Sequence, residues 1–177
     1  RQGELIQIGS RAARAKRVKA FFHTPPAKQI HLVIAPTKNN NRMEWLIEKL
    51  TELGVTSITP LICAHSERKI TKALRFEKIA IAALKQSQQF FLPQIHPLIP
   101  FSEYIKENPE SSYIAHCGSS PKQNLATFDL NKDSVTLLIG PEGDFSSEEI
   151  NSATKLGYIP VSIGFQRFRT ETAGLLA

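Results

Sequence analysis

Leu138-Ile139-Gly140-Pro141-Glu142-Gly143-Asp144-Phe145-Ser146 is a glycine-bearing loop that directly follows a short apolar strand. A second loop of this kind lies further along the chain, Ile163-Gly164-Phe165-Gln166-Arg167-Phe168-Arg169-Thr170-Glu171-Thr172-Ala173. Glycines in the first loop permit backbone torsions and close approach that a side chain would block, and the proline stiffens the turn. Loops between a strand and a helix are where α/β sheets bind ligands. Two of them predict a small-molecule site built from adjacent strand ends.

The nature of this ligand is restricted by what the two loops lack. Neither contains the Gly-rich phosphate motif that ends in Lys-Ser or Lys-Thr, and neither contains the dinucleotide motif G-x-G-x-x-G. Glu142 and Asp144 would repel a phosphate, and the first loop has no basic residue to offset them. We therefore expect a neutral or cationic ligand, which includes a zwitterion or a sulfonium compound.

Strand and helix patterns alternate from Gln29 onward. Apolar runs predict strands over 30–35, 58–62, 113–117, 135–139 and 159–163. Helices are predicted from Asn41 to Gly54, around the apolar positions Leu74, Ile79, Ala83 and Leu84, from the capping-box pair Ser146 and Glu149 to Leu156-Gly157, and over 173–177. The alternation predicts an α/β fold with a parallel sheet and helices on both faces.

The positive charge of the chain is concentrated at one end. Net charge is +6, and residues 1–28 hold seven basic residues and one acidic residue, whereas residues 29–177 hold fifteen of each. Most of the excess comes from Arg11, Arg14, Lys16, Arg17 and Lys19. We expect these residues in a loop between strands at 5–8 and 18–22, with Thr24-Pro25-Pro26 as a connector. Such a patch is typical of phosphate-backbone binding, although a solvated basic surface without a partner is the alternative.

The two loops together resemble the RsmE family of 16S rRNA uridine-N3 methyltransferases, which belong to the SPOUT class and use S-adenosylmethionine. The resemblance rests on Ile139-Gly140-Pro141-Glu142-Gly143 and Arg169-Thr170-Glu171-Thr172-Ala173. Supporting segments are Asn41-Arg42-Met43-Glu44, Glu52-Leu53-Gly54-Val55, Pro60-Leu61, Ser66-Glu67-Arg68 and Gln86-Ser87 followed by Pro93. The resemblance implies a C-terminal trefoil knot in the SPOUT-type sheet and a homodimer. It also implies a methyltransferase domain over 29–177 and part of a small PUA-like RNA-binding β-barrel over 1–28.

The resemblance also implies which residues bind the cofactor, S-adenosyl-L-methionine. The expected cofactor-binding residues are Leu138, Ile139, Gly140, Pro141, Glu142, Gly143, Ile163, Gly164, Phe165, Phe168, Thr170, Thr172 and Ala173. We expect Thr170 and Thr172 to cap the last helix. Glu142 or Asp144 could act as a general base if buried, although we expect Glu142 to fix its loop.

Arg169 is the expected catalytic residue. Its guanidinium could stabilise the anion of a uracil that has lost its N3 proton, or hold the phosphate of the target nucleotide. The structural alternative is an ion pair with Glu171 or Glu142.

The expected RNA-binding residues are Arg11, Arg14, Lys16, Arg17, Lys19, Arg42 and Arg68, and Lys69 and Arg75 could extend this surface. Outside the N-terminal segment, ordinary helix-surface charge is the alternative. Phe90 and Phe91 fit a core or an interface better than a base-stacking platform. The five histidines receive no role, and we expect no metal site. The two cysteines are expected to be buried free thiols.

The chain departs from the family pattern at several positions. Asp144 stands where a second glycine usually follows Gly-Pro-Glu-Gly, Gln166 replaces a usual basic residue, and Lys85 and Gln89 replace a usual glutamate and arginine. The leading reading is methylation of small-subunit rRNA, on the 30S subunit, by a cytoplasmic enzyme without a membrane segment. A non-catalytic ribosome-binding or assembly protein of the same fold is one alternative, and a SPOUT enzyme for another RNA is a second.

Overall fold

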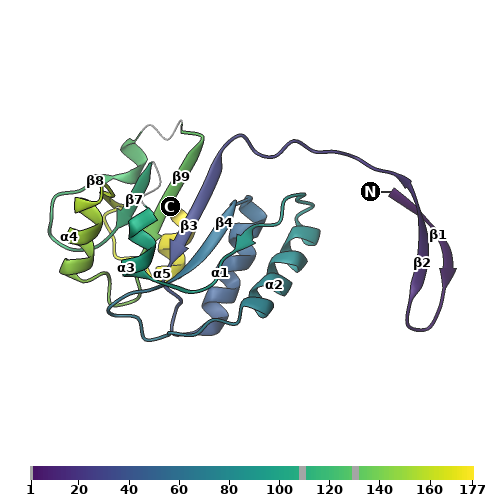
Figure 1. Ribbon diagram of the computed structural model, residues 1–177, viewed down its shortest axis with the longest axis horizontal. Helices are drawn as coiled ribbons and strands as arrows, with labels where there is room; N and C mark the ends of the chain where they lie inside the picture. Colours follow the sequence, from purple (N-terminus) through teal and green to yellow (C-terminus); the bar gives the residue numbers. More distant parts are fainter. Residues whose placement is uncertain (1, 108–110, 129–131) are drawn as a thin grey trace.

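The computed structural model describes residues 2–107, 111–128 and 132–177. Two strands, β1 (Gln2–Ile8) and β2 (Ala13–Lys19), form an antiparallel hairpin at the N-terminus. An extended segment over 20–28 leads from this hairpin into a larger α/β unit, and the hairpin projects away from that unit (Figure 1). The connector expected around Thr24-Pro25-Pro26 therefore lies between the two parts.

The α/β unit is built on an eight-stranded sheet in which every strand pair is parallel. Its strands are β3 (Gln29–Ile34), β4 (Ser57–Ile62), β5 (Gln94–Ile95), β6 (Ile99–Pro100), β7 (Ser112–Ala115), β8 (Gln123–Asn124), β9 (Ser134–Ile139) and β10 (Ile159–Ser162). The order across the sheet is β5-β4-β3-β9-β7-β10-β8, and β6 also pairs with β4. The predicted parallel sheet is confirmed.

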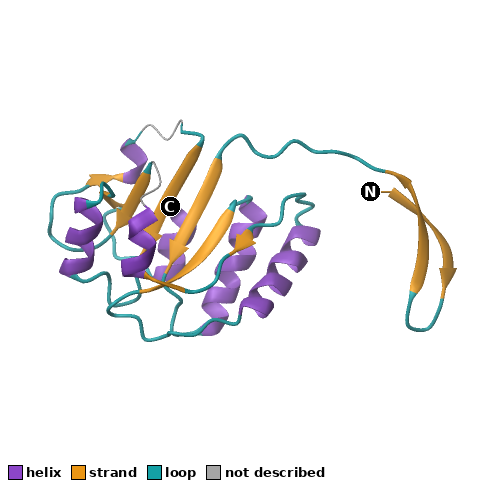
Figure 2. Ribbon diagram, in the orientation of Figure 1, coloured by secondary structure: helices purple, strands orange, loops and turns teal. Residues whose placement is uncertain are grey.

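Helices cover both faces of this sheet, as the alternation predicts (Figure 2). The helices α1 (Asn40–Leu53), α2 (Ala73–Gln86) and α5 (Thr170–Leu176) contribute side chains to one hydrophobic core. The opposite core contains residues of α3 (Phe101–Tyr104), the 3₁₀ turn Ile105–Glu107 and α4 (Ser147–Lys155). A second 3₁₀ turn covers Leu125–Thr127. Alternate strand residues enter the two cores because side chains alternate across a strand: Leu137 and Ile139 face one core and Leu138 the other.

The helix ends follow local sequence signals with small corrections. The Asn39 side chain, not Asn41, caps α1, and it accepts a hydrogen bond from the backbone N–H of Asn41. Gly54 ends α1 in the left-handed conformation with φ 81°. The capping box of Ser146 and Glu149 is present at the start of α4.

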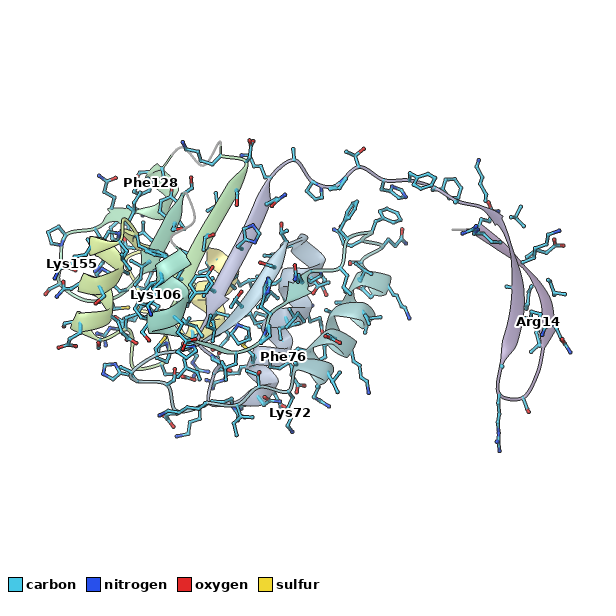
Figure 3. All side chains as sticks on the ribbon, viewed as in Figure 1. Arg14, Lys72, Phe76, Lys106, Phe128 and Lys155 are labelled. Carbon is cyan, nitrogen blue, oxygen red and sulfur yellow. The ribbon has the colours of Figure 1, made fainter. Side chains whose placement is uncertain are left out.

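The helix α2 buries a different set of side chains from the one expected. Phe76, Ala80 and Ala83 are buried, whereas Leu74 is 76% exposed. Figure 3 labels Phe76 where α2 packs against the rest of the domain. Leu74 lies in the first turn of α2, on a side of the helix that no neighbouring element covers, so its predicted burial is wrong.

The prediction that the basic residues form a loop is wrong for most of them. The pairing of Ile8 with Ala13 closes a short turn over 9–12, so Arg14, Lys16, Arg17 and Lys19 lie within β2. Arg14 is labelled on this hairpin in Figure 3. Both faces of the hairpin are exposed, so long charged side chains on either face keep their hydration. The basic residues consequently form a charged ribbon.

Both cysteines are free, and Cys63 is buried, whereas the predicted burial of Cys117 is wrong because Cys117 is exposed. Burial raises the pKa of the Cys63 thiol above its usual value, so it stays protonated. None of the described helices is both long and apolar enough to cross a membrane.

Candidate functional site

A pocket of about 630 Å³ opens where β7, β9 and β10 end. These three strands are neighbours in the order β9-β7-β10, and because they are parallel their carboxyl ends lie at the same edge of the sheet. From the first loop the pocket is lined by Ile139, Gly140, Pro141, Glu142, Gly143 and Asp144, and from the second loop by Ile163, Gly164, Phe165, Gln166, Arg167, Phe168, Arg169, Thr170 and Ala173. The two loops singled out in the sequence thus form one cavity.

Two of the expected cofactor-binding residues are not among those that line the pocket. Leu138 is fully buried in the core beneath the sheet edge, and Thr172 lies in the first turn of α5. Leu138 precedes the end of β9 by one residue, so its side chain points to the opposite face from that of Ile139.

The first loop uses close approach at Gly140 and a strained torsion at Asp144. A Cβ on Gly140 would lie 3.0 Å from the backbone nitrogen of Phe145, so a side chain there would require the backbone at Phe145 to shift by a few tenths of an ångström. The left-handed torsion belongs to Asp144, whose φ is 64°. Both carboxylate oxygens of Asp144 accept backbone hydrogen bonds, Oδ2 from Cys117 at 2.7 Å and Oδ1 from Phe145 at 2.8 Å. These bonds stabilise a torsion that non-glycine residues rarely adopt.

The Glu142 carboxylate fixes the first loop to the loop that follows β3, as expected. Its Oε1 accepts a hydrogen bond of 2.9 Å from the backbone N–H of Lys38. The Arg68 guanidinium holds the same loop from the other side and donates to the carbonyl oxygens of Thr37 and Lys38 at 3.1 and 2.7 Å. A network of three segments therefore supports the pocket, and Arg68 belongs to it.

The second loop leads directly into α5, with Arg169 at the N-cap position. No side chain caps this helix, so the predicted capping by Thr170 and Thr172 is wrong; Thr170 is instead buried in the first turn. Arg169 is exposed at the pocket, and its side chain makes no hydrogen bond or ion pair with any described residue, whereas its backbone carbonyl oxygen accepts from Ala173. The predicted alternative of an ion pair is wrong, since Glu171 pairs with Arg42 and Glu142 accepts from Lys38. The Arg169 guanidinium is thus available to a ligand.

Sequence reasoning missed one wall of the pocket. Ala115 ends β7 and His116 and Cys117 follow it, Lys122 lies before β8, and Ser162 ends β10. The signal that could have found the first three is their position at the carboxyl end of an apolar strand, the same signal that identified the other loops. That β7 lies between β9 and β10 was not deducible from the strand pattern.

Histidines, to which the sequence assigned no role, contribute at two places around the pocket. The His65 Nδ1 lies 3.1 Å from the Gly143 carbonyl oxygen and 3.0 Å from that of Asp144, so its N–H donates to the first loop. His116 is buried in the pocket wall. Burial lowers its pKa below the usual value; the Lys122 charge lowers it further, and the Asp144 carboxylate opposes them.

The arginines of α1 and α2 that are expected on the RNA surface are engaged within the protein. Arg42 pairs with Glu171, and Arg75 forms a two-pronged ion pair with Glu44 in which Nη2 lies 2.6 Å from Oε2. A core position for Phe90 is wrong, because its side chain is 62% exposed and stacks on the His23 ring of the connector at 3.5 Å between ring centroids.

Comparison with known proteins shows what kind of protein contains this pocket. Residues 24–177 match the model of the RNA methyltransferase domain. A ribosomal RNA small subunit methyltransferase E of Buchnera aphidicola is 33% identical over 98% of this chain and 71% of its own length. The chain belongs to this family of RNA methyltransferases. The resemblance inferred from the two loops is confirmed.

Solved structures agree with this assignment. A probable rRNA methyltransferase from Porphyromonas gingivalis is 36% identical with a TM-score of 0.90, and the match covers 98% of this chain and 75% of that one. A ribosomal RNA small subunit methyltransferase E from Neisseria gonorrhoeae, solved bound to S-adenosyl methionine, is 28% identical with a TM-score of 0.79. That match covers 98% of this chain and 73% of that one.

Proposed function

We propose that this chain transfers a methyl group from S-adenosylmethionine to N3 of a uridine in small-subunit rRNA, with the 30S subunit as substrate. The observation that carries the proposal is that both glycine-bearing loops, after β9 and β10, line the same pocket. The chain that contains this pocket belongs to the RNA methyltransferase family. The name of the Buchnera relative and the cofactor bound to the Neisseria relative supply the substrate class and the methyl donor.

The residues that line the pocket fit this cofactor. Its volume of about 630 Å³ lies within the usual range of small-molecule sites. Gly140 has no side chain and lies against the Phe145 backbone, so the wall there exposes backbone groups, which suits recognition of neutral adenine and ribose groups. Glu142 and Asp144 add negative charge that favours a sulfonium over a phosphate. When bound, S-adenosylmethionine supplies an electrophilic methyl group.

We assign the substrate contact to Arg169. Uracil N3 becomes nucleophilic only when its proton leaves, and negative charge then spreads to the neighbouring carbonyl oxygens. A guanidinium without an internal partner, at the rim of the pocket, can donate hydrogen bonds to that charge. Most of the rate can come from positioning, because methyl transfer is an in-line displacement.

The charged ribbon of β2 supplies the second part of the proposal, RNA binding. Its exposed basic residues, separated from the pocket by the extended segment 20–28, can contact rRNA phosphates away from the target base. We assign residues 1–28 to part of a PUA-like β-domain and residues 29–177 to the methyltransferase domain. The trefoil knot of the SPOUT class, the homodimer and the cytoplasmic location stay predictions.

Methyl-labelled S-adenosylmethionine tests this function directly. The protein is incubated with unmethylated 30S subunits, 50S subunits or tRNA, and the modified base is mapped. Label at uridine N3 in 30S subunits alone is the expected result. Label in another RNA would overturn the substrate, and cofactor binding without label would favour the non-catalytic reading.

The role of Arg169 is tested separately by Arg169→Ala, with Lys155→Ala on the exposed side of α4 as the control. Loss of transfer with nearly unchanged cofactor affinity is expected for Arg169→Ala alone. A normal rate in this variant would exclude Arg169 from the chemistry.

A further inference from the structure

Phe165, in the second loop, is the most exposed large apolar side chain of the described residues. Its exposed fraction is 101%, so its ring is left uncovered by the rest of the described chain. An isolated apolar side chain on a surface needs no explanation by itself. Phe165, however, belongs to the loop that lines the pocket, where the substrate of the proposed reaction has to approach. The role inferred for its ring rests on that proposed function.

The other phenylalanine of this loop, Phe168, has a structural role that Phe165 lacks. Phe168 is half-buried, and its ring lies so close to the Gly164 backbone that a Cβ on Gly164 would come within 3.1 Å of it. The Phe168 ring therefore packs against the loop itself. Because Phe165 makes no comparable contact, the fold of the loop does not depend on its ring. The Phe165 ring is available to a ligand that covers the open side of the pocket.

The charges next to Phe165 favour a nucleic acid as this ligand. Arg167 and Arg169 lie in the same loop, both are exposed, and their side chains make no hydrogen bond or ion pair with a described residue. Residues 163–170 include no aspartate or glutamate, and the acidic residues of the pocket belong to the first loop. Proteins bind single-stranded nucleic acid with this combination, because aromatic rings stack on bases while cationic groups contact phosphates. A second copy of this chain, whose loop carries the same two positive charges, fits this surface less well.

The proposed reaction also leaves a base without a stacking partner beside the pocket. An enzyme that modifies a base takes that base out of its stack, so the target uracil enters the pocket and its neighbour in the strand loses one stacking contact. An aromatic side chain can replace that contact, since every base presents a flat face to a ring. The Phe165 ring, which is exposed on the loop that lines the pocket, meets this requirement.

We propose that the Phe165 ring stacks on the nucleobase adjacent to the target uridine and holds the RNA strand while the uracil lies in the pocket. This assigns the ring to the RNA, whereas the sequence placed Phe165 among the cofactor-binding residues. The ring takes no part in the transfer of the methyl group. It therefore acts on the affinity for the RNA substrate and leaves the affinity for the cofactor unchanged.

Three variants test this contact: Phe165→Ala, Phe165→Leu and Phe165→Tyr. We expect Phe165→Ala to raise the KM for 30S subunits by about 5–150-fold, the range for the loss of one stacked base. Phe165→Tyr keeps a flat ring and should match the native protein, whereas Phe165→Leu keeps apolar surface without a ring and should resemble Phe165→Ala. Leu74→Ala is the control, since Leu74 is 76% exposed on α2 and does not line the pocket. The affinity for S-adenosylmethionine, measured by calorimetry without RNA, should stay the same in all four variants.

Photocrosslinking identifies what the side chain at this position touches, and it does not depend on methylation. Position 165 is replaced by photoreactive benzoylphenylalanine, and the protein is irradiated with unmethylated 30S subunits. We expect a crosslink to small-subunit rRNA at the nucleotide next to the uridine that the native protein methylates. The same replacement at position 74 is the control and should give no crosslink at that nucleotide.

The outcomes distinguish the two proposals. A native protein that labels no uridine N3 overturns the proposed function, and the crosslink then still decides whether the side chain at position 165 touches RNA. If the native protein is active, an unchanged KM for 30S subunits in Phe165→Ala shows that the ring does not bind the RNA. A loss of cofactor affinity in that variant would return Phe165 to the cofactor site. A crosslink to a second copy of the chain in place of RNA would make the ring part of a subunit interface, and it would also overturn the inference.

Discussion

The Glu171 carboxylate lies 3.5 Å from the Nε atom of Arg42, so an ion pair joins the first turn of α5 to the first turn of α1. Glu171 is two residues beyond Arg169, and its side chain is only 9% exposed. The pair therefore anchors the helix whose N-cap position faces the pocket. Arg42, which is expected on the RNA surface, therefore also supports the candidate site.

We expect Glu171→Gln to destabilise the protein by about 1–2 kcal/mol, because Arg42 keeps its charge without a partner while its own partial exposure limits the loss. Urea denaturation measures this change. Glu67→Gln is the matched control: the Glu67–Lys38 pair is exposed, so its removal should leave the denaturation midpoint unchanged. Equal midpoints for the two variants would contradict the anchoring role.

Asp144 allows a prediction that separates backbone strain from hydrogen bonding. Asp144→Ala keeps the left-handed torsion and loses both side-chain hydrogen bonds, so we expect a loss of about 2–3 kcal/mol. Asp144→Gly loses the same bonds but relieves the torsion, so its loss should be only about 1 kcal/mol. Thermal denaturation of the two variants gives the comparison. An alanine variant as stable as the glycine variant would show that the torsion is not strained in solution.

Stability should fall as the pH drops from 7 toward 5. Burial, followed by the His96 charge, lowers the pKa of His31, whose Nδ1 lies 2.7 Å from the Ser57 hydroxyl. Below about pH 6.5 the unfolded chain binds a proton at His31, whereas the folded chain does so only at a lower pH. Acid therefore lowers the free energy of unfolding by up to about 1.4 kcal/mol per pH unit for one histidine. His116 acts in the same direction. His31→Gln should give a shallower fall of melting temperature with acid, and an unchanged slope would exclude His31.

The charged ribbon on β2 predicts the salt dependence of RNA binding. Arg14 and Lys16 are exposed and make no described ion pair, so both are free to contact phosphates. Arg14→Gln combined with Lys16→Gln should lower the slope of log affinity against log salt by about two. Glu4→Gln on β1 is a control with the opposite charge change. An unchanged slope would show that Arg14 and Lys16 do not contact RNA phosphates.

Much of the fold follows from local sequence signals. Continuous apolar runs identified β3, β4, β7, β9 and β10 but not the two-residue strands β5, β6 and β8. Gly54 and the pair Ser146 and Glu149 marked helix ends. These features depend on residues close in the chain, where periodicity and capping have a direct physical cause. The two glycine-bearing loops identified most of the pocket for the same reason.

The wrong predictions concern features that depend on contacts between segments far apart in the sequence. Leu74 fits a helical apolar face, but no other element covers its side of α2. His116 was given no role, and its place among the pocket-lining residues depends on β7 lying between β9 and β10, which crossover connections set and strand patterns do not encode. Thr170 is a residue type that often caps helices. In the structure Arg169 occupies the N-cap position instead, so Thr170 is the first residue of α5 and is buried.

The bonds from Arg68 to Lys38 and from Lys38 to Glu142 have a thermodynamic consequence. They tie the segment just before α1 to the first loop of the pocket. Any RNA contact that displaces this segment must change the affinity of the pocket for its small ligand. Linkage requires the reverse effect to be equally large, so pocket occupancy would change RNA affinity by the same factor. The strength of that coupling would then depend on these two hydrogen bonds between side chains and the backbone of Lys38.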